Sequence, residues 1–419
     1  MSVFGFEERE LASLVRSVRP ERPGADAPDG SLADEFAALV WTSIAEPGDR
    51  VCGALTRALG PGLALRLLIE RVEPERIAAE VEAREATGEP RPALVAALRD
   101  ALDRWQPRIS ARLAVRAIEQ AARFRVGAIL PQDPDWPRGL DDLGESAPAA
   151  LWFRGDVERF RWFARSVAVV GARASTGYGD HVAAELTAGL GDRGVAIVSG
   201  GAYGIDGVAH RTALASDART VAILAGGLDR FYPSGHDALL TRVAADGLVI
   251  AEVPCGTSPT RWRFLQRNRV LAAATIATIV VEAGARSGSL NTAGHAAQLG
   301  RRLGAVPGPV TSAASAGCHR LLREFDADCI TSVDDALELA GLDVTEPGSA
   351  VDPAPRTDPP DVVRVLDALS PRQPMDAMSV AAAAGMSLGD VLAVLGPLEL
   401  EGRARESERG WLRSTTVAT

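Results

Sequence analysis

The middle of the chain alternates short, continuously apolar runs with amphipathic stretches of helical period. Six of the apolar runs, rich in β-branched residues, lie at residues 167–170, 195–198, 220–224, 248–251, 278–281 and 303–306. Strands that are apolar on both faces and separated by helices are typical of a parallel sheet that helices cover on both sides. The pattern therefore predicts an α/β fold, with a doubly wound parallel sheet in an extended Rossmann-like domain over residues 126–342.

The N-terminal segment has a helical pattern instead. Residues 1–125 are rich in Ala, Leu and Arg at helical spacing, with polar, Pro-bearing loops expected at Pro20–Gly30 and Gly88–Pro92. We expect a helical N-terminal domain of the SAM-like or helix-hairpin-helix-like type. The run Leu59–Leu63 (Leu-Gly-Pro-Gly-Leu) is either the phosphate-binding turn of a helix-hairpin-helix or an ordinary turn between two helices.

The C-terminal part predicts a linker and a small domain. Residues 343–360 are rich in Pro and Asp and lack periodicity, which is typical of a linker. Residues 361–419 then predict three short helices and a β-hairpin, the order of a winged helix. Its last helix, expected from Leu388 to Gly402, carries three acids and no base, and we expect Pro397 to shorten it. Because a helix that enters the major groove normally brings cations, we expect this domain to contact protein or to support a dimer.

Composition places the chain among soluble globular proteins of a reducing compartment. Hydrophobic residues make up 47% and charged residues 24%, and the N-terminus lacks a secretory signal. No apolar run reaches the roughly 18 residues that a membrane span needs. The four cysteines, Cys52, Cys255, Cys318 and Cys329, are scattered, which argues against a disulfide framework and a zinc ribbon. We expect a cytoplasmic protein without a membrane segment.

The basic residues narrow the function further. The chain has no lysine, which argues against a Walker A loop and a Schiff-base enzyme, since both depend on a lysine amine. The net charge is −10, yet residues 258–323 hold nine arginines and one acid, Glu282. These arginines are Arg261, Arg263, Arg267, Arg269, Arg286, Arg301, Arg302, Arg320 and Arg323. Because nucleic-acid binding depends on where charge lies rather than on its sum, this stretch indicates a polyanionic ligand.

Glycine-rich loops follow four of the predicted strands, at residues 171–179, 199–206, 226–229 and 282–289. In a parallel sheet such loops share one edge, where glycine lets the backbone approach a phosphate and the next helix presents free N–H groups. Arginines and small hydroxyls add donors. The residues expected to bind phosphate are Gly171, Arg173, Ser199, Gly200, Gly201, Arg286, Ser287, Gly288 and Ser289. Several phosphates in a row indicate a nucleic-acid strand rather than a mononucleotide.

The segment Arg261–Arg269 (RWRFLQRNR) interleaves cations with aromatic side chains. Single-stranded nucleic acid is bound in this way, because a base that stacks on an aromatic ring contributes about 1–3 kcal/mol. The residues expected to contact DNA here are Arg263, Phe264, Arg267, Asn268 and Arg269. The alternative is that Trp262 and Phe264 belong to the core and the arginines to a solvated helix face.

No enzyme motif is complete. Asp206 and His210 are four residues apart on one expected helix, either as an acid–imidazole pair or as ordinary helix stabilisation, and no nucleophile is placed beside them. The run Gly385–Gly389 matches the G-x-S-x-G elbow but falls within the winged helix. The dinucleotide fingerprint is missing, and the five histidines show no metal-ligand spacing. We therefore expect no catalytic residue, no cofactor and no metal site.

The loop sequences resemble those of the DNA-processing protein A (DprA/Smf) family. The matching phrases, in the family's order between about residues 129 and 331, are VAVVGARASTGYG, IVSGGAYGIDGVAH, GLDRFYP, AEVPCG, FLQRNR, VVEAGARSGSLNTA and AVPG. Four positions depart from the family's pattern. Ala172 stands in place of a serine, Gly201 in place of a leucine, Leu265 in place of a proline, and His319 in place of the asparagine of a Gly-x-Asn phrase.

The resemblance implies a homodimer that binds single-stranded DNA and carries out no covalent chemistry. It implies that the protein protects incoming single-stranded DNA and helps to load a RecA-type recombinase during DNA uptake and transformation. It also implies that Arg173, Ser199–Gly201 and Arg267–Arg269 line the DNA groove.

Two other functions stay open. One is a nucleotide-processing phosphoribohydrolase of a related Rossmann family, although Ala225–Asp229 lacks the Thr and the downstream Glu of those enzymes' glycine-rich phrase. The other is a regulatory role, exercised through protein contacts of the C-terminal domain.

Overall fold

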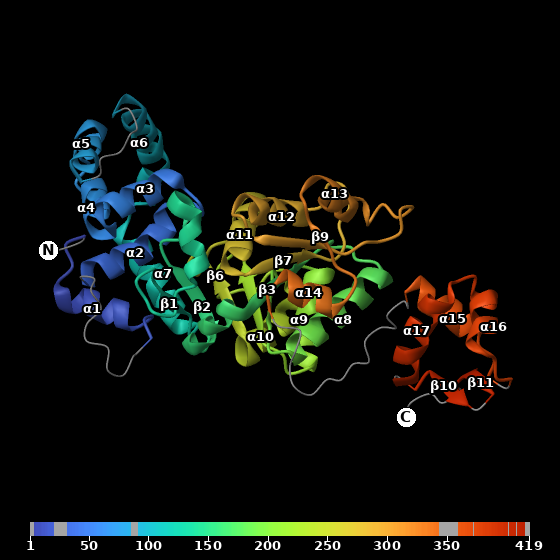
Figure 1. Cartoon of the computed structure of the whole chain (residues 1–419). Helices are drawn as coiled ribbons and strands as arrows, with labels where there is room; N and C mark the ends of the chain where they lie inside the picture. The colour runs from blue at the N-terminus through green and yellow to red at the C-terminus, as the bar shows by residue number, and fades with distance from the viewer. Residues whose placement is uncertain are drawn as a thin grey trace. The chain divides into compact units, whose positions relative to one another are not determined.

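The computed structural model describes residues 4–20, 32–84, 91–342, 359–371, 373–400, 402–407 and 409–414 (Figure 1). The chain divides into two compact units, Met1–Val344 and Thr345–Thr419. The linker expected at 343–360 and the loop expected at Pro20–Gly30 lie almost entirely outside the described residues. In the loop expected at Gly88–Pro92, Arg91 and Pro92 instead begin helix α6 (Arg91–Trp105), because the first turn of a helix tolerates a proline.

Among the described residues, nine strands form one sheet in the first unit (Figure 1). In chain order they are β1 (Gly127–Ile129), β2 (Leu151–Gly155), β3 (Ser166–Val170), β4 (Ala196–Ser199), β5 (Thr220–Leu224), β6 (Leu248–Ala251), β7 (Ala277–Val280), β8 (Arg302–Ala305) and β9 (Asp328–Cys329). Their spatial order is β1-β2-β6-β5-β4-β3-β7-β8-β9. The pairs from β6 to β9 are parallel, and the pairs β1–β2 and β2–β6 are antiparallel. The six strands that the apolar runs predicted, β3 to β8, are confirmed.

Three strands were not predicted from the apolar pattern. β1 and β9 have three and two residues, which is too short to show a period, and both residues of β9 are exposed. β2 pairs antiparallel with β6 from Trp152–Ala251 to Gly155–Leu248. The doubly wound sheet therefore ends in two antiparallel pairings, β2 with β6 and β1 with β2, and antiparallel edge strands are a common addition to parallel sheets.

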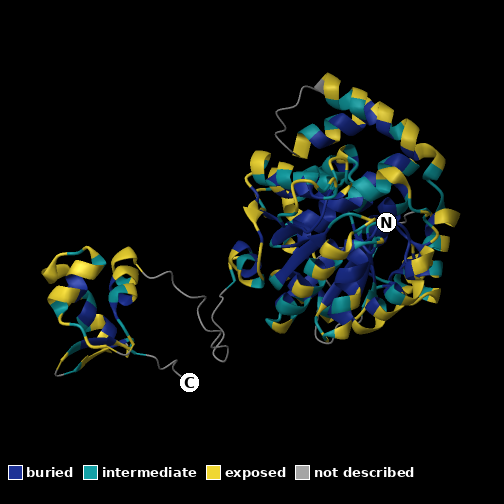
Figure 2. Cartoon of the chain, turned by 90° about the vertical axis from the view of Figure 1, so that its right-hand side faces the viewer, coloured by how far each residue is buried: buried dark blue, intermediate teal, exposed yellow. Residues whose placement is uncertain are grey.

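Helices cover both faces of the sheet. On one face, Val167 and Val169 share a buried cluster with α8 (Gly177–Asp192), α9 (Ile205–Ala215) and α14 (Val333–Leu339). On the other, Ala168 and Val170 share one with α11 (Arg261–Ala274), α12 (Ser289–Gln298) and α13 (Ala316–Glu324). The remaining elements of this part are α10 (Asp237–Asp246), η2 (Arg138–Ser146), η3 (Val157–Arg165) and η4 (Ser234–His236). Strands β3 to β7 lie buried between the two layers (Figure 2), which confirms the predicted α/β architecture.

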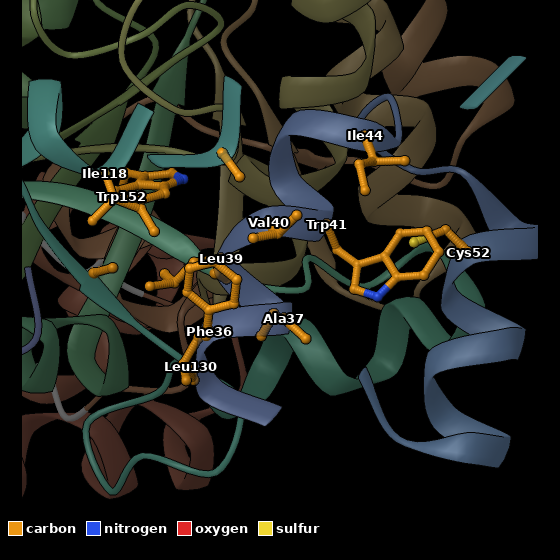
Figure 3. Close-up of a cluster of buried hydrophobic side chains, with 14 of the residues drawn as sticks. Phe36, Ala37, Leu39, Val40, Trp41, Ile44, Cys52, Ile118, Leu130 and Trp152 are labelled. Carbon is orange, nitrogen blue, oxygen red and sulfur yellow. The ribbon is translucent and has the colours of Figure 1, made fainter. Parts of the chain in front are cut away.

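The N-terminal helices share their core with the sheet. They are α1 (Glu8–Arg16), α2 (Leu32–Ile44), α3 (Arg50–Leu59), α4 (Pro61–Ile69), α5 (Pro74–Arg84), α6, η1 (Gln106–Arg108) and α7 (Ala111–Arg123). Trp41 of α2 and Trp152 of β2 lie in one buried cluster (Figure 3). The Trp152 Nε1–H donates to Thr42 Oγ1 at 3.1 Å. The helical character predicted for the N-terminal segment is confirmed, and this packing places α7 beside the sheet.

The turn between α3 and α4 is closed by a contact within the protein. Gly60 has a φ of 79°, and the two helices meet at a bend of 110°. The Gly62 N–H donates to Asp34 Oδ1 at 2.9 Å. Because this amide already has an acceptor, the structure favours an ordinary helix–helix turn over a phosphate-binding one.

The second unit has the predicted winged-helix order. Its elements are α15 (Pro360–Ala368), α16 (Ala377–Ala384), α17 (Leu388–Leu400), β10 (Ala404–Ser407) and β11 (Gly410–Arg413), and the two strands pair antiparallel. Gly385 ends α16 with a φ of 64°, so the G-x-S-x-G match is a turn between helices. The expectation that Pro397 shortens the last helix is wrong. α17 runs through the proline to Leu400, because buried Leu395 and Leu398 anchor the helix on both sides of it.

No single helix among the described residues is long and apolar enough to cross a membrane. The pairs α3 with α4 and α16 with α17 meet that requirement only when two helices bent by 110° and 107° are taken together.

Candidate nucleic-acid interface

The loops that follow the parallel strands lie side by side at one edge of the sheet. In spatial order they follow β6, β5, β4, β3 and β7, at residues 252–260, 225–236, 200–204, 171–176 and 281–288. Because neighbouring strands are about 4.8 Å apart, these five loops extend over about 19 Å. We call this surface, together with the N-terminal half of α11, the carboxyl edge.

A buried carboxylate holds the loop that carries Arg173. Glu282, at the end of β7, is buried and accepts hydrogen bonds from the Thr176 N–H and Oγ1–H, both at 2.8 Å. Its backbone carbonyl accepts the Ala172 N–H at 2.7 Å. The Ala172 carbonyl in turn accepts the Ile205 N–H at 3.2 Å, which joins this loop to the start of α9. Glu282 therefore positions the β3 loop. Because its carboxylate is buried, it is not a surface charge that would neutralise the arginines of the 258–323 stretch.

Arg267 lies beneath the β4 loop. The residue is 7% exposed, its Nη1–H donates to the Ile223 carbonyl at 2.6 Å, and its Nε has no hydrogen-bond partner among the residues that the structure describes. The guanidinium lies directly against Gly200, where any Cβ would collide with it. Burial lowers the pKa of Arg267 to about 10, which the nearby Asp206 carboxylate opposes and the Arg173 charge reinforces. Arg267 is thus a charged, incompletely bonded group at the centre of the carboxyl edge.

Two guanidiniums meet at the ring of Phe264. The Arg173 guanidinium lies 4.9 Å from the ring centre and that of Arg267 lies 6.0 Å from it. The ring of Tyr232 approaches Phe264 with the centroids 5.8 Å apart. Arg173 is exposed and forms no ion pair with any described residue. The stacking brings two predicted phosphate ligands from distant parts of the sequence to one point.

Other predicted arginines bind carboxylates of this protein. Arg269 forms a bidentate ion pair with Glu252 at 2.8 and 2.7 Å, and its side chain is buried. Arg263 pairs in the same way with Glu46 at 2.9 and 2.8 Å. Arg301 pairs with Asp142 across the fold. The arginine-rich stretch is therefore partly neutralised by acids from elsewhere in the chain.

Three of the predicted small residues, Gly171, Ser199 and Gly201, have structural roles in their loops. Ser199 is buried and donates to the Val169 carbonyl at 2.7 Å, and Gly171 lies against Ile205. Gly201 has a φ of 69°, a conformation that suits glycine at this point of departure from the family's pattern. In the described part of the chain, these positions shape the β3 and β4 loops.

The β7 loop lies beside α11. The Asn268 Nδ2–H donates to Asn291 Oδ1 at 3.1 Å and to the Gly288 carbonyl at 3.4 Å. The hydroxyls of Ser287 and Ser289 are 2.7 Å apart at the start of α12. Arg286 is exposed and forms no ion pair within the described ranges. This loop therefore offers the exposed Arg286 cation beside the loop that carries Arg173, while Ser289 is buried with its hydroxyl against that of Ser287.

The sequence-based reasoning did not identify the tyrosines as site residues. The three tyrosines of the chain, Tyr178, Tyr203 and Tyr232, follow β3, β4 and β5, and they are 43%, 47% and 51% exposed. Trp262, at the start of α11, is 55% exposed, whereas Phe264 is covered by Arg173 and Tyr232. In the sequence, all three tyrosines stand in or next to glycine-rich loops, and this position could have identified them as candidate site residues. The exposed rings of Tyr203, Tyr232 and Trp262 supply flat apolar surfaces in three successive segments of the carboxyl edge.

The structure does not join Asp206 and His210 as an acid–imidazole pair. The Asp206 carboxylate accepts the Ala202 N–H at 3.3 Å, and burial raises its pKa against the effect of Arg267. His210 Nδ1 lies 2.8 Å from Thr220 Oγ1, and burial lowers the pKa of this imidazole to about 3. Both side chains therefore stabilise the β4–α9 region. Within the part of the chain that the structure describes, no group of three or more His, Cys, Asp and Glu side chains is arranged to hold a metal.

Comparison with known proteins identifies related sequences. The chain matches the family model of DNA recombination-mediator protein A over residues 127–341 and that of the DprA winged helix domain over residues 347–408. It is 46% identical to a protein of Mycobacterium tuberculosis described as a DNA processing protein DprA, over 299 residues that cover 68% of this chain and 76% of that protein. It is 37% identical to DNA processing protein DprA of Streptococcus pneumoniae over 205 residues, 49% of this chain and 71% of that protein.

The fold is also similar to a solved structure. The X-ray structure of DNA processing protein A from Streptococcus pneumoniae superposes with a TM-score of 0.57 and 29% identity, covering 73% of this chain and 97% of that one.

Proposed function

The chain belongs to the DNA recombination-mediator protein A (DprA/Smf) family of DNA-processing proteins, and from this premise we propose that its carboxyl edge holds a single strand of DNA. The observation that carries the proposal is the pair of guanidiniums at Phe264. Arg267 is buried with an unpartnered Nε, and Arg173 is exposed without an acid partner among the described residues. A backbone phosphate at this point supplies the missing acceptors for both forks.

The second phosphate site is the β7 loop. Arg286 is exposed, and Ser287, Gly288 and Ser289 stand at the start of α12, where backbone N–H groups and small hydroxyls favour an anion. Asn268 bonds this loop to α11, the helix that carries Arg267. A strand that passes from the β7 loop to the β4 loop meets donors at each step.

The exposed aromatic side chains favour a single strand over a duplex. Trp262, Tyr232 and Tyr203 present open rings along the edge, and unpaired bases can stack on them. The bases of a duplex are already stacked on one another and lie inside its backbone. Ring stacking combined with phosphate ligands is thus selective for unpaired DNA.

We further propose the role that the family resemblance implies. The protein would be a cytoplasmic homodimer that protects incoming single-stranded DNA and helps to load a RecA-type recombinase in DNA uptake. The proposal assigns no covalent step to the protein. The phosphoribohydrolase alternative finds no support, because Gly226 and Gly227 are buried and the Gly227 N–H donates to the Thr257 carbonyl at 2.8 Å.

The test is the binding of a labelled oligothymidylate, followed by fluorescence anisotropy. Arg173→Ala removes a charge-assisted contact of about 1.5–3 kcal/mol and should weaken binding by about 10- to 100-fold. Wild-type affinity should also fall with salt, with a log–log slope of about −0.7 per phosphate contacted. Arg302→Ala is the matched control, since Arg302 is exposed at the opposite end of β8. Equal affinities for wild type and Arg173→Ala would overturn the assignment.

A further inference from the structure

A cleft of about 470 Å³ opens between α7 and the loop that joins β6 to α11. Leu113, Arg116 and Gln120 line it from α7, and Gly256 and Thr257 line it from the loop. The two walls are joined through Asp229, which accepts the Gln120 Nε2–H at 2.9 Å and the Gly256 N–H at 2.8 Å. The cleft is therefore built into the junction of the N-terminal helices and the sheet.

The cleft begins where the carboxyl edge ends. β6 is the last parallel strand on this side of the sheet, and the loop after it borders both surfaces. Thr257 shows the continuity, because its carbonyl accepts the Gly227 N–H of the β5 loop while the residue lines the cleft. A strand that follows the edge past Tyr232 and Trp262 reaches the mouth of the cleft.

The lining has a surplus of positive charge. Arg108, Arg116 and Arg263 face one acid, Glu46. Although burial favours the neutral form, hydrogen bonds from Arg263 and Arg108 hold the pKa of Glu46 below its usual range. This carboxylate is thus occupied by two guanidiniums, at 2.8 Å from each. Arg116 is exposed and has no ion pair among the described residues, so its charge faces the cleft uncancelled.

An apolar surface lies next to this cation. Leu113, one turn before Arg116, is 47% exposed at the rim, and Ala117 and Pro254 contribute further apolar wall. The Arg116 guanidinium suits a phosphate group, and the Leu113 side chain suits a flat, largely apolar ring. The volume is within the range of about 300–1,000 Å³ that is typical of small-molecule sites. A nucleotide has this combination of charge, shape and size.

We propose that this cleft holds a further nucleotide of the bound strand, with its phosphate on Arg116 and its base against Leu113. The inference rests on the proposed function, since it extends the strand from the carboxyl edge onto the N-terminal helices. Two lengths of DNA then distinguish the surfaces: a short strand fills the edge alone, and a longer one also enters the cleft.

The test compares labelled oligothymidylates of about 6 and about 15 nucleotides on the full chain. Arg116→Ala and Leu113→Ala should each weaken binding of the longer strand about 5- to 10-fold and leave the shorter one unchanged, and Arg116→Glu should weaken the longer strand more than Arg116→Ala does. Arg76→Ala is the control, because Arg76 is an exposed arginine of the N-terminal helices outside the cleft. Arg173→Ala should weaken both lengths.

The failures are distinguishable. If Arg116→Ala leaves both lengths unchanged while Arg173→Ala weakens both, the cleft assignment is overturned and the edge assignment stands. If wild type binds neither strand, the proposed function falls and the cleft assignment falls with it. If thymidine monophosphate alone binds the cleft and is lost in Arg116→Ala without any effect of strand length, the site takes free nucleotides and the continuation of the strand is refuted.

Discussion

At the scale of the residue, Arg267 shows how surroundings decide the chemistry of a side chain. It is buried beneath Gly200, and burial lowers its pKa to about 10, so it remains charged at neutral pH. A buried charge with an unpartnered N–H costs free energy, because water that would have solvated it is excluded. A bound phosphate would supply the acceptor that the fold leaves out. Among the nearby arginines, Arg263 and Arg269 each pair with a carboxylate of this protein, although the Arg269 Nε, like that of Arg267, has no hydrogen-bond partner within the described residues.

Gly200→Ala tests this packing. A methyl group at residue 200 would collide with the Arg267 guanidinium, so either the side chain or the β4 loop must move. We expect affinity for oligothymidylate to fall by about tenfold or more, the effect of losing one charge-assisted contact. Gly294→Ala is the control, because a Cβ there meets open space on α12 and should only favour the helix. If Gly200→Ala binds as tightly as this control, Arg267 is not a phosphate ligand.

At the scale of the element, α11 sends its arginines to different partners. Arg263 and Arg267 are one turn apart, yet Arg263 reaches Glu46 near α2 and Arg267 reaches the end of β5. Arg269, about 200° around the helix from Arg267, turns to Glu252 instead. The helix thereby ties the N-terminal helices, the β6 loop and the carboxyl edge together. Its position, rather than its charge count, determines which cation is available to a ligand.

The winged unit supplies another element-scale prediction. α17 carries Asp390 and Glu399 and no basic side chain among its described residues, while Leu392 and Leu400 are exposed. An acidic helix gains little from a phosphate backbone. Removing residues 345–419 should therefore leave the affinity for oligothymidylate within about twofold of wild type, as anisotropy would show. A loss of affinity much larger than this would assign DNA contacts to the unit.

At the scale of the whole molecule, the net charge of −10 and an arginine-lined edge are compatible because the charges are sorted in space. Acids outside the 258–323 stretch, namely Glu46, Asp142 and Glu252, pair with arginines inside it. Arg173, Arg267 and Arg286 are left without an ion pair among the described residues. The surrounding negative charge would disfavour DNA elsewhere on the protein, which favours a strand at the edge and in the adjoining cleft.

Stability of the molecule should depend on pH through His210. Its pKa is about 3 in the fold and 6.5 without it, so between these values the unfolded chain binds the extra proton. The free energy of unfolding should then fall by about 1.4 kcal/mol for each unit by which the pH drops below about 6.5. Above about pH 7.5, the titration of His210 should no longer change the free energy of unfolding. Denaturant unfolding of wild type and His210→Asn over this range checks the sign. The variant should show the weaker pH dependence; parallel curves would refute the assignment.

The sequence by itself determined the strands β3 to β8 and predicted where the proposed ligand surface lies. Short, continuous apolar runs rich in β-branched residues and separated by helical patterns are typical of strands buried on both faces, and the carboxyl ends of parallel strands share an edge. Glycine, arginine and small hydroxyls in the following loops then indicated phosphate. The same local patterns predicted the helical N-terminus and the winged-helix order. These features depend on residues close together in the chain, which is why they could be predicted.

Only the tertiary structure decided which of the predicted residues are available to a ligand. The acids that neutralise Arg263 and Arg269 lie on other elements, and no local pattern couples Glu46 to a helix more than 200 residues later. The Ser199 hydroxyl is buried and donates to a backbone carbonyl, and the order of the strands brings Tyr203 and Tyr232 to one edge. The cleft beside α7 exists only because the N-terminal helices share a core with the sheet. Ion pairing and burial depend on contacts made through space, and those are set when the elements pack.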